Sequence, residues 1–326
     1  MYAEFFNLTG LPFQLTPDSR FFYESSVHAK AMAHLTYGLN QAEGFIVITG
    51  DVGAGKTTLV DYLCSSLDPQ RYVIARMLTT QTSADDTLRL AAAGFGIRTD
   101  GLTKAEIIQR FEETLVANFN SGRRSLLLVD EAQNLTVAAI EELRMLSNFV
   151  VNHETPLQSF LLGQPQFRET LASPDLEQLR QRVLASYHLG PMGEAETRAY
   201  IEHRLRLVGW KDDPHFTDDA FRQIYAETGG IPRKINSLCS RLMLFGFLEE
   251  AHEVSLDAVT QVADELRTEL GGTAEAKNAA QAAKATDADL RQFDARLARM
   301  EERLEKSDLA IKRALAVIAS RLDKDG

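Results

Sequence analysis

Cysteine is scarce in this chain, with Cys64 and Cys239 the two examples in 326 residues. They lie far apart in the sequence, and neither belongs to a C-x-x-C pair. This spacing suggests neither a cysteine-ligated metal site nor a thioredoxin-like redox pair. Two buried thiols in a reducing compartment are the simplest interpretation.

Membrane-spanning segments and several catalytic motifs are missing as well. No segment reaches the roughly 18 consecutive apolar residues of a membrane-spanning helix, and the first residues lack the basic and apolar regions of a signal peptide. The histidines show no H-E-x-x-H or H-x-x-x-H spacing, and no G-x-S-x-G turn occurs. We therefore expect a cytoplasmic protein without a membrane span, and we predict no metal site built on histidine pairs.

Basic residues are outnumbered, with 35 Lys and Arg against 46 Asp and Glu and a net charge of −11. This balance disfavours a broad nucleic-acid-binding surface, although a local basic patch remains compatible with it. The nearest candidate patch is formed by Arg204, Arg206 and Lys211 beside Trp210. A solvated helix face is the favoured interpretation of these residues, and nucleic-acid contact is the alternative.

The most informative segment that the chain does contain runs from Gly50 to Thr57 and reads G-D-V-G-A-G-K-T. It follows the apolar run 45–49 and precedes a helix-like segment, 58–67, which is the context that a P-loop requires. Glycines let the backbone wrap so that several N–H groups face one phosphate, and the helix behind adds its positive dipole end. Lys56 is expected to reach the outer phosphates of a nucleotide, and the Thr57 hydroxyl is expected to bind Mg²⁺.

The predicted nucleotide-binding residues are Gly50, Asp51, Val52, Gly53, Ala54, Gly55, Lys56, Thr57 and Thr58.

A second apolar run, 125–130, ends in two carboxylates, Asp130 and Glu131. It is too short for a membrane span and is typical of a buried parallel strand. Ligands bind at the C-terminal ends of such strands. Because successive strand side chains point in opposite directions, the two acids should have different roles. We predict that Asp130 holds Mg²⁺ through water and that Glu131 is the general base that orients and activates the attacking water. The alternative is that both acids simply open a polar loop.

Apolar runs alternate with helical patterns up to about residue 190, which predicts a parallel α/β sheet flanked by helices. The composition is ordinary for a globular protein, and the length favours about two domains. Helix-like periodicity occurs at 83–95, 103–120 and 136–150. The expected strands are 45–49, 72–77, 125–130, 158–163 and 185–189.

Residues 191–270 show no strand pattern and predict a small all-helical second domain. Its expected helices are 194–208, 217–227, 232–249 and 256–270. Thr217 and Ser255 are credible N-caps, and Gly229-Gly230 is a credible helix stop.

The last part of the chain changes composition. Residues 271–288 are rich in small and charged side chains and predict a linker. Residues 289–322 carry a heptad-like repeat that includes Leu290, Leu297 and Leu304, which predicts a coiled-coil helix. One amphipathic helix packed back on the body is the alternative.

Together, these features resemble an AAA+ ATPase of the general secretion pathway protein A (ExeA-type) family, over roughly residues 1–268. The branch that it resembles most occurs in exosortase and exopolysaccharide gene clusters. Beside the P-loop and the L-L-L-V-D-E strand, the matching elements are Tyr2-x-x-Phe5-Phe6, Leu11-Pro12-Phe13, Pro17-Asp18, His28, Gly163-Gln164-Pro165, Leu179-Arg180-Gln181-Arg182 and Gly229-Gly230-Ile231-Pro232-Arg233.

The resemblance implies further roles. Gln164 resembles a sensor residue that hydrogen-bonds the γ-phosphate or the attacking water, an exposed loop amide being the alternative. Arg233 resembles a second sensor that reaches from the helical domain to the phosphates, for which a guanidinium fork is suited; a surface arginine is the alternative.

Arg182, or else Arg180, resembles the arginine finger that acts on a neighbouring subunit's site, with an internal ion pair as the alternative. The opening segment with Phe13 and Pro17 resembles the lining of an adenine pocket, or else anchors the N-terminus. ATP and Mg²⁺ are the implied cofactors, and homo-oligomers are the implied assembly.

Three functions compete at this stage. The first is an ATPase that couples ATP hydrolysis to assembly or regulation of a bacterial envelope export or exopolysaccharide system, through a protein partner at its cytosolic face. The second is an ATP-gated DNA-binding regulator resembling transposition ATPases, which the acidic composition disfavours. A small-molecule kinase is the third, and it would leave the helical domain without a role.

Overall fold

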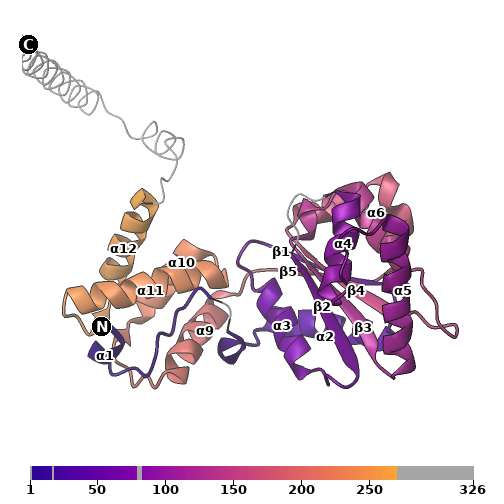
Figure 1. Cartoon of the computed structure of the whole chain (residues 1–326). Coiled ribbons are helices and arrows are strands. Elements are labelled where there is room, and N and C mark those ends of the chain that lie inside the picture. Colours follow the sequence, from indigo (N-terminus) through magenta and orange to yellow (C-terminus); the bar gives the residue numbers. More distant parts are fainter. Residues whose placement is uncertain (1, 17, 79–82, 270–326) are drawn as a thin grey trace, which may run out of the picture. The chain divides into compact units, whose positions relative to one another are not determined.

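Five strands form one parallel sheet in the order β2-β3-β4-β1-β5 (Figure 1). Each strand starts and ends within two residues of the predicted segment, because each is a short, mostly apolar stretch bounded by polar turns. The strands are β1 Phe45–Gly50, β2 Tyr72–Leu78, β3 Arg124–Asp130, β4 Leu157–Gly163 and β5 Val183–Leu189.

This computed structural model describes residues 2–16, 18–78 and 83–269, and the residues up to Ala263 belong to one unit. The predicted linker 271–288 and the predicted coiled-coil helix 289–322 lie outside the described residues.

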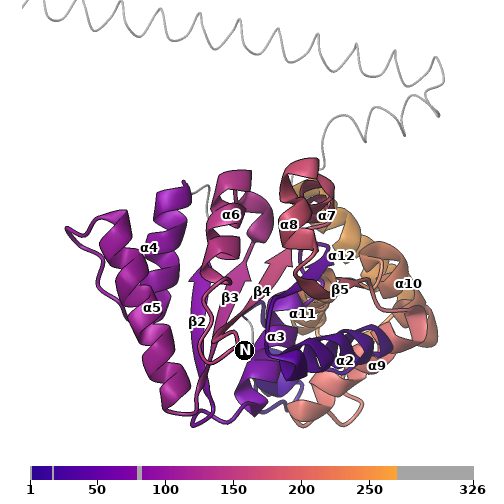
Figure 2. The same cartoon turned by 90° about the vertical axis from the view of Figure 1, so that its right-hand side faces the viewer.

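Side chains of successive sheet residues enter two separate apolar layers. Phe45 and Val47 of β1 pack with α4, α5 and α6, whereas Ile46 and Ile48 pack with α2 and α3. Figure 2 shows these helices around the sheet. The helices are α2 Ser26–Gln41, α3 Lys56–Ser66, α4 Ala84–Gly94, α5 Lys104–Asn120, α6 Val137–Leu146, α7 Gln166–Ala172 and α8 Glu177–Arg180, with 3-10 turns η1 Ser19–Phe21, η2 Ala132–Asn134 and η3 Pro174–Leu176.

Two sequence predictions about this part need correction. The helix predicted over 136–150 ends at Leu146, because Ser147 caps it and the chain turns into a bridge between Val151 and Glu154. Helix α2 was not predicted, because its buried face mixes His28 and Gly38 with Ala31, which weakens the apolar period.

The helical part follows β5 and agrees with its four predicted helices. They are α9 Glu194–Leu207, α10 Asp218–Thr228, α11 Pro232–Leu248 and α12 Leu256–Glu269. Thr217 caps α10 through its hydroxyl, and Gly229 ends that helix in a left-handed conformation. The prediction of an all-helical domain needs correction, because β6 (His215–Phe216) and β7 (Glu253–Val254) form a short parallel pair. These two strands are too brief for the sequence pattern to indicate.

The first residues of the chain pack into the core of this helical part. Helix α1 (Tyr2–Phe5) contacts α11, and Phe6, Leu8 and Phe13 are buried beside Ile201. Phe13 is therefore a core residue. Pro17 lies outside the described residues, and the domain boundaries themselves stay a prediction. The main chain thus passes between the helical part and the sheet twice, once after Phe13 and once after Leu189.

Within residues 2–16, 18–78 and 83–269, no helix combines the length and the apolar character needed to cross a membrane.

The second crossing depends on Gly230, whose carbonyl accepts a hydrogen bond from Met192 N at 3.1 Å. Gly229 and Gly230 both have positive φ, but a Cβ on Gly230 would lie 2.0 Å from the Met192 carbonyl oxygen, whereas a Cβ on Gly229 would meet nothing within 4 Å. Gly229→Ala should therefore cost about 1–2 kcal/mol of stability. We expect Gly230→Ala to cost at least about 2 kcal/mol more, because the backbone must move.

Urea unfolding of the two variants measures this difference. Equal losses of stability would show that left-handed strain alone, and not the close approach of Met192, requires glycine at position 230.

Candidate functional site

The loop 51–55 joins β1 to α3 in a space that excludes side chains at three glycines. A Cβ at Gly50 would lie 2.5 Å from the Leu189 carbonyl oxygen, and one at Gly53 would lie 2.4 Å from Cβ of Arg233. At Gly55, with φ of 95°, a Cβ would lie 3.0 Å from Nε2 of His28. The glycines of the motif are therefore required by their neighbours as well as by the backbone path.

The start of α3 leaves backbone donors free for an anion. Its N-cap is Gly55, which makes no side-chain cap hydrogen bond. The first N–H groups of a helix have no partner within the helix and carry the positive end of its dipole. Among the predicted binding residues, those lining the adjoining cavity are Val52, Gly53, Gly55, Lys56, Thr57 and Thr58. Gly50, Asp51 and Ala54 instead contribute carbonyl oxygens that hold neighbouring side chains.

Lys56 is a buried cation inside the loop. Its Nζ donates to the carbonyl oxygens of Gly50 at 2.8 Å and Asp51 at 3.0 Å. Burial lowers the pKa of Lys56 below its ordinary value, and the carboxylates of Glu131 and Asp130 oppose that shift. The ammonium is therefore held by weak neutral acceptors, which a phosphate oxygen can replace.

Asp130 ends β3 and faces α3. Its Oδ2 accepts a hydrogen bond from the Thr57 hydroxyl at 2.7 Å, and its Oδ1 accepts one from the Glu131 N–H at 2.8 Å. The P-loop and the acidic pair, predicted from separate motifs, thus meet at these two side chains.

Glu131 follows β3 instead of continuing it, with φ of 54° and ψ of 41°. A left-handed conformation is uncommon for glutamate and costs free energy, and such residues cluster at functional sites. This turn sends the two carboxylates to different surroundings, so the strand alternation assumed from the sequence is not the reason for their divergence. Glu131 lines the same cavity as Lys56.

Two amides hold the Glu131 carboxylate. Its Oε2 accepts hydrogen bonds from Gln133 Nε2 at 2.5 Å and from Gln164 Nε2 at 3.2 Å. Gln164 follows β4, the strand beside β3, and its N–H donates to Gln133 Oε1 at 2.9 Å. Gln164 is therefore a half-buried part of the site and not an exposed loop amide. The sequence analysis did not identify Gln133 as a site residue, although it lies two residues after Glu131.

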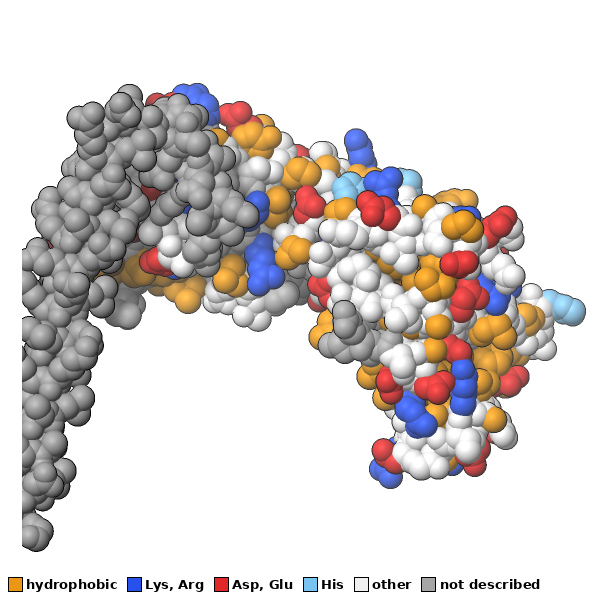
Figure 3. All heavy atoms as spheres, turned by 90° about the horizontal axis from the view of Figure 1, so that it is seen from above, with side chains coloured by type: hydrophobic (Ala, Val, Ile, Leu, Met, Phe, Trp, Pro, Cys, Tyr) orange, Lys and Arg blue, Asp and Glu red, His pale blue; other side chains and the backbone are white. Residues whose placement is uncertain are grey.

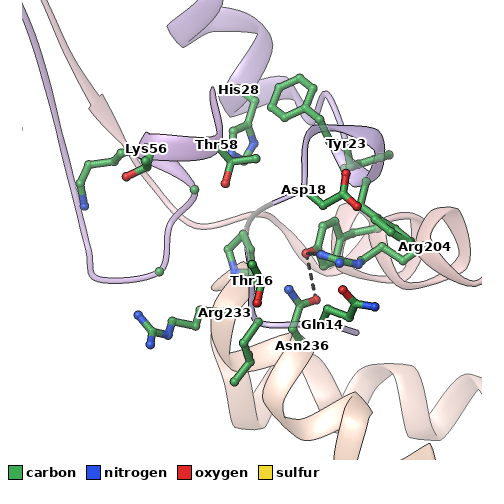
Figure 4. A pocket seen from close by; sticks show the side chains of 18 of the residues that line it. Gln14, Thr16, Asp18, Tyr23, His28, Lys56, Thr58, Arg204, Arg233 and Asn236 are labelled. Carbon is green, nitrogen blue, oxygen red and sulfur yellow. Dashed lines mark hydrogen bonds between the residues drawn. The ribbon is translucent and has the colours of Figure 1, made fainter. Parts of the chain in front are cut away.

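Arg233 lies directly beside the P-loop. Its N–H donates to the Gly53 carbonyl at 3.2 Å, and its exposed side chain lines the cavity. Figure 4 shows it at the start of α11, and among the described residues its guanidinium makes no ion pair. The loop and the helical part therefore meet through this residue.

Arg182 lies at the opposite end of the sheet from the P-loop, because β5 runs parallel to β1 with Val183 beside Phe45 and Leu189 beside Gly50. Its Nη1 donates to the carbonyl and the hydroxyl of Ser147, both at 3.1 Å. Arg180 donates to backbone carbonyls of Leu171 and Ser173. With six strand residues between them, about 20 Å separates Arg182 from the phosphate-binding loop of its own chain.

The cavity beyond the loop is lined by part of the opening segment, residues 14–16 and 18–23. The cavity has a volume of about 360 Å³ and runs from Lys56 and Glu131 to side chains of α9 and α11 (Figure 4). That volume is in the range of small-molecule sites. The lining supplied by residues 14–23 consists of Gln14, Leu15, Thr16, Asp18, Phe21, Phe22 and Tyr23. The resemblance placed an adenine pocket near Phe13, and the residues that follow Phe13 are the ones that line this cavity.

Arg204 corrects another prediction, because it is not on a solvated face. It is 6% exposed, its Nε donates to the Pro12 carbonyl at 2.6 Å, and its guanidinium lies over Phe21. The sequence does carry a signal for this burial, because Arg204 lies on the apolar face of its helix, four residues after Tyr200. Arg206, by contrast, pairs with Glu202 on the surface.

The described surface shows no broad basic patch in the view of Figure 3, where basic and acidic side chains are interspersed.

His28 supports the loop from behind. Its Nδ1 is 2.7 Å from the Ser25 hydroxyl, and its Nε2 is 3.3 Å from the Ala54 carbonyl oxygen. Because a carbonyl only accepts, Nε2 carries the proton and Nδ1 accepts from Ser25. Burial lowers the pKa of His28.

Comparisons with known proteins agree with this geometry. Residues 39–171 match the AAA domain family. The chain has an AAA-type P-loop fold. It is also related to general secretion pathway protein A of Aeromonas hydrophila, with 37% identity over 255 residues, which cover 78% of this chain and 46% of the relative. The chain thus spans about half the length of that curated relative.

Solved structures support the fold alone. Cdc6p of Pyrobaculum aerophilum has a TM-score of 0.58 at 13% identity, covering 76% of this chain and 71% of that one. The ADP form of the Aeropyrum pernix ORC2 protein has a TM-score of 0.56 at 17% identity, covering 77% and 73%.

The buried histidine predicts a pH effect on stability. Because the pKa of His28 is lower in the folded chain than its ordinary 6.5, protons bind preferentially to the unfolded chain below that pH. The contribution of His28 is thus fully present above about pH 6.5 and is lost as the pH falls. When the pH is lowered from 7.5 to 5.5, the melting temperature of His28→Gln should therefore fall less than that of the wild type.

His34→Gln is the matched control, because His34 is an exposed histidine on the same helix. Part of the pH effect should remain in His28→Gln, since burial also lowers the pKa of His203. Parallel pH profiles for His28→Gln and the wild type would contradict the assignment.

Proposed function

We propose that this chain is an Mg²⁺-dependent ATPase whose nucleotide state is sensed by its helical part. One observation carries the proposal: Lys56, Thr57 and Glu131 line one cavity, and Asp130 accepts a hydrogen bond from Thr57, although two distant segments supply these residues. The AAA-type fold supports the choice of a nucleoside triphosphate.

The residues present fit a triphosphate and its metal ion. Gly53, Gly55 and the start of α3 line the cavity, and no side chain caps the first N–H groups of that helix, so a phosphate group can approach these backbone donors. Thr57 and Asp130 offer a hydroxyl and a carboxylate oxygen 2.7 Å apart, and both are the hard oxygen ligands that Mg²⁺ takes. Mg²⁺, when bound, neutralises charge on the phosphate oxygens of the nucleotide.

Glu131 is the general base in this proposal. Its carboxylate accepts a proton from the attacking water, and Gln133 and Gln164 fix its orientation through the hydrogen bonds to Oε2. Lys56 stabilises negative charge on the phosphoryl group that is transferred. Gln164 also presents an amide at the end of β4 that can bind the water or the outer phosphate.

Arg233 connects hydrolysis to the helical part. Its backbone is already bonded to Gly53, and its guanidinium has no ion-pair partner among the described residues. Phosphate oxygens are suitable acceptors for this fork of donors. Loss of the outer phosphate would remove that contact and free α11 to shift.

Two substitutions separate binding from hydrolysis. Lys56→Ala should abolish ATP binding, because it removes the buried cation of the loop. Glu131→Gln should bind ATP with an affinity near that of the wild type and reduce turnover by about 10²-fold or more, because an amide cannot accept the proton. Calorimetric titration and phosphate release measure the two effects, and wild-type turnover in either variant would refute the proposal.

We further propose that hydrolysis drives assembly or regulation of a bacterial envelope export or exopolysaccharide system through a protein partner. The relationship to general secretion pathway protein A supports this role. Lys56→Ala and Glu131→Gln also test this role in cells. Each variant should block export when its gene replaces the native copy. Normal export with Glu131→Gln, together with ATP-dependent DNA binding, would favour the regulator alternative.

The position of Arg182 supports an assembly in which one copy of the chain contributes a residue to the nucleotide site of its neighbour. At the far end of β5, Arg182 cannot act on its own chain's phosphates, so a catalytic role requires a neighbouring copy. We propose that it is the arginine finger of a homo-oligomer.

Arg182→Ala should reduce turnover by about 10³-fold in the assembled state. Turnover by the isolated monomer should not change, because no neighbour's site is present. Arg180→Ala is the matched control, since the guanidinium of Arg180 is held by the backbone carbonyls of Leu171 and Ser173 of its own chain. Full activity of a strictly monomeric wild type, measured with light scattering, would contradict the finger role.

A further inference from the structure

The side chain of Glu196 holds the starts of two helices that belong to different parts of the molecule. Its Oε2 accepts a hydrogen bond from the Gly193 N–H at 3.3 Å, at the start of its own helix, α9. Its Oε1 accepts one from the Ser26 N–H at 2.6 Å, at the start of α2 and 170 residues away along the chain. Helix α9 packs in the core of the helical part, whereas α2 packs on the sheet. This carboxylate therefore joins the two parts.

The Glu196 carboxylate is ionised in this arrangement. Partial burial acts to raise its pKa, but the hydrogen bonds from Ser26 and Gly193 more than offset that effect, so the pKa of Glu196 lies below its ordinary value. Hydrogen bonds to an ionised acceptor are about twice as strong as those between neutral groups, and negative charge is favourable at a helix N-terminus. Glu196 thus makes a strong contact although its side chain is only half-buried.

The first turn of α2 passes this contact on to the P-loop. Ser25 is the N-cap of α2, and its hydroxyl is bonded to Nδ1 of the His28 ring at 2.7 Å. On the other side of the ring, Nε2 donates to the Ala54 carbonyl at 3.3 Å. The His28 ring is 5% exposed, so its position is set by these neighbours. The turn that Glu196 holds from one side therefore supports the P-loop from the other.

The helical part is thereby attached to the P-loop at two separate points. From α11, the Arg233 N–H is bonded directly to the Gly53 carbonyl. From α9, Glu196 reaches the loop indirectly, through the start of α2 and His28. The two attachments end at adjacent residues of the loop, Gly53 and Ala54. A movement of α9 away from α2 would withdraw the second support from the loop even where the first stays in place.

We propose that Glu196 is a latch between the helical part and α2, and that it acts through Ser26 and His28 as a positioning residue for the P-loop. This rests on the proposed nucleotide site. With the latch closed, the loop keeps the conformation in which its N–H groups are available to a phosphate. With the latch open, the loop samples other conformations, and the apparent nucleotide affinity falls with the fraction that is competent to bind. A partner that draws α9 away from α2 would in this way release the nucleotide.

Glu196→Ala opens the latch, and calorimetric titration with ADP measures the result without hydrolysis. ADP affinity should fall at least about fivefold, the lower end of ordinary coupling between sites. Glu196→Gln keeps one acceptor oxygen for the Ser26 N–H, so its ADP affinity should lie between those of the wild type and Glu196→Ala.

Glu194→Ala is the matched control, because Glu194 is an exposed acid in the same first turn of α9. It removes a similar charge–dipole interaction without touching the bond to α2, so ADP affinity should stay within about twofold of the wild type. Equal losses of ADP affinity in Glu194→Ala and Glu196→Ala would overturn the proposal.

A double-mutant cycle tests whether the latch acts through His28. His28→Asn shortens the side chain so that it no longer reaches the Ala54 carbonyl. In that background, Glu196→Ala should weaken ADP binding by less than about twofold more, because the link to the loop is already broken. A purely structural role for Glu196 would lower the melting temperature and add its full loss of ADP affinity to that of His28→Asn, which would overturn the positioning role.

Hydrogen exchange without nucleotide separates a failure of the latch from a failure of the nucleotide site. Amides of residues 51–56 should exchange at least about tenfold faster in Glu196→Ala than in Glu194→Ala, because the loop opens more often. Equal exchange of the loop in the two variants overturns the latch, whatever the ADP affinities are. If the wild type binds no ADP while loop exchange still depends on Glu196, the nucleotide site is refuted and the latch stands.

Discussion

The close packing of the P-loop against three other elements is the constraint on which the site depends. The loop touches the end of β5 at Gly50, the start of α11 at Gly53 and the His28 side chain of α2 at Gly55. A β-carbon has no room at Gly50 or Gly53, and at Gly55 it would press on the His28 ring. The loop conformation that exposes backbone donors to a phosphate is therefore also the conformation that joins the sheet to the helical part. Arg233, whose N–H is bonded to the Gly53 carbonyl, is the residue through which the proposed function connects the loop to α11.

The opening segment gives the cavity a second wall. Residues up to Phe13 belong to the helical core, residues 14–23 line the cavity, and α2 packs on the sheet. The cavity lining thus joins the P-loop to the crossing after Phe13 and to side chains of α9 and α11, which makes the cavity a suitable place for coupling nucleotide state to movement.

Sequence alone predicted the sheet and the acidic and glycine-rich motifs because each is a short continuous segment with its own pattern. Each of the five strands is a short, mostly apolar segment, and the P-loop is eight consecutive residues. Arg204 and Asn236 could not be placed by such patterns, because Pro12, which accepts from Arg204, is 192 residues away from it, and Tyr200, which donates to Asn236, lies on another helix. The turn at Glu131 also escaped, since nothing in a glutamate indicates a positive φ. Residues 14–16 and 18–23 contain only the short 3-10 turn Ser19–Phe21, so periodicity says nothing about them, and only the family resemblance pointed to this segment.

A structure of the chain with a non-hydrolysable ATP analogue and Mg²⁺ tests the central claim most directly. The account predicts that the Lys56 ammonium leaves the carbonyls of Gly50 and Asp51 for phosphate oxygens, and that the metal ion separates Thr57 from Asp130 with Glu131 beside the outer phosphate. A triphosphate bound away from the P-loop, or one whose metal ion contacts neither Thr57 nor Asp130, would contradict it.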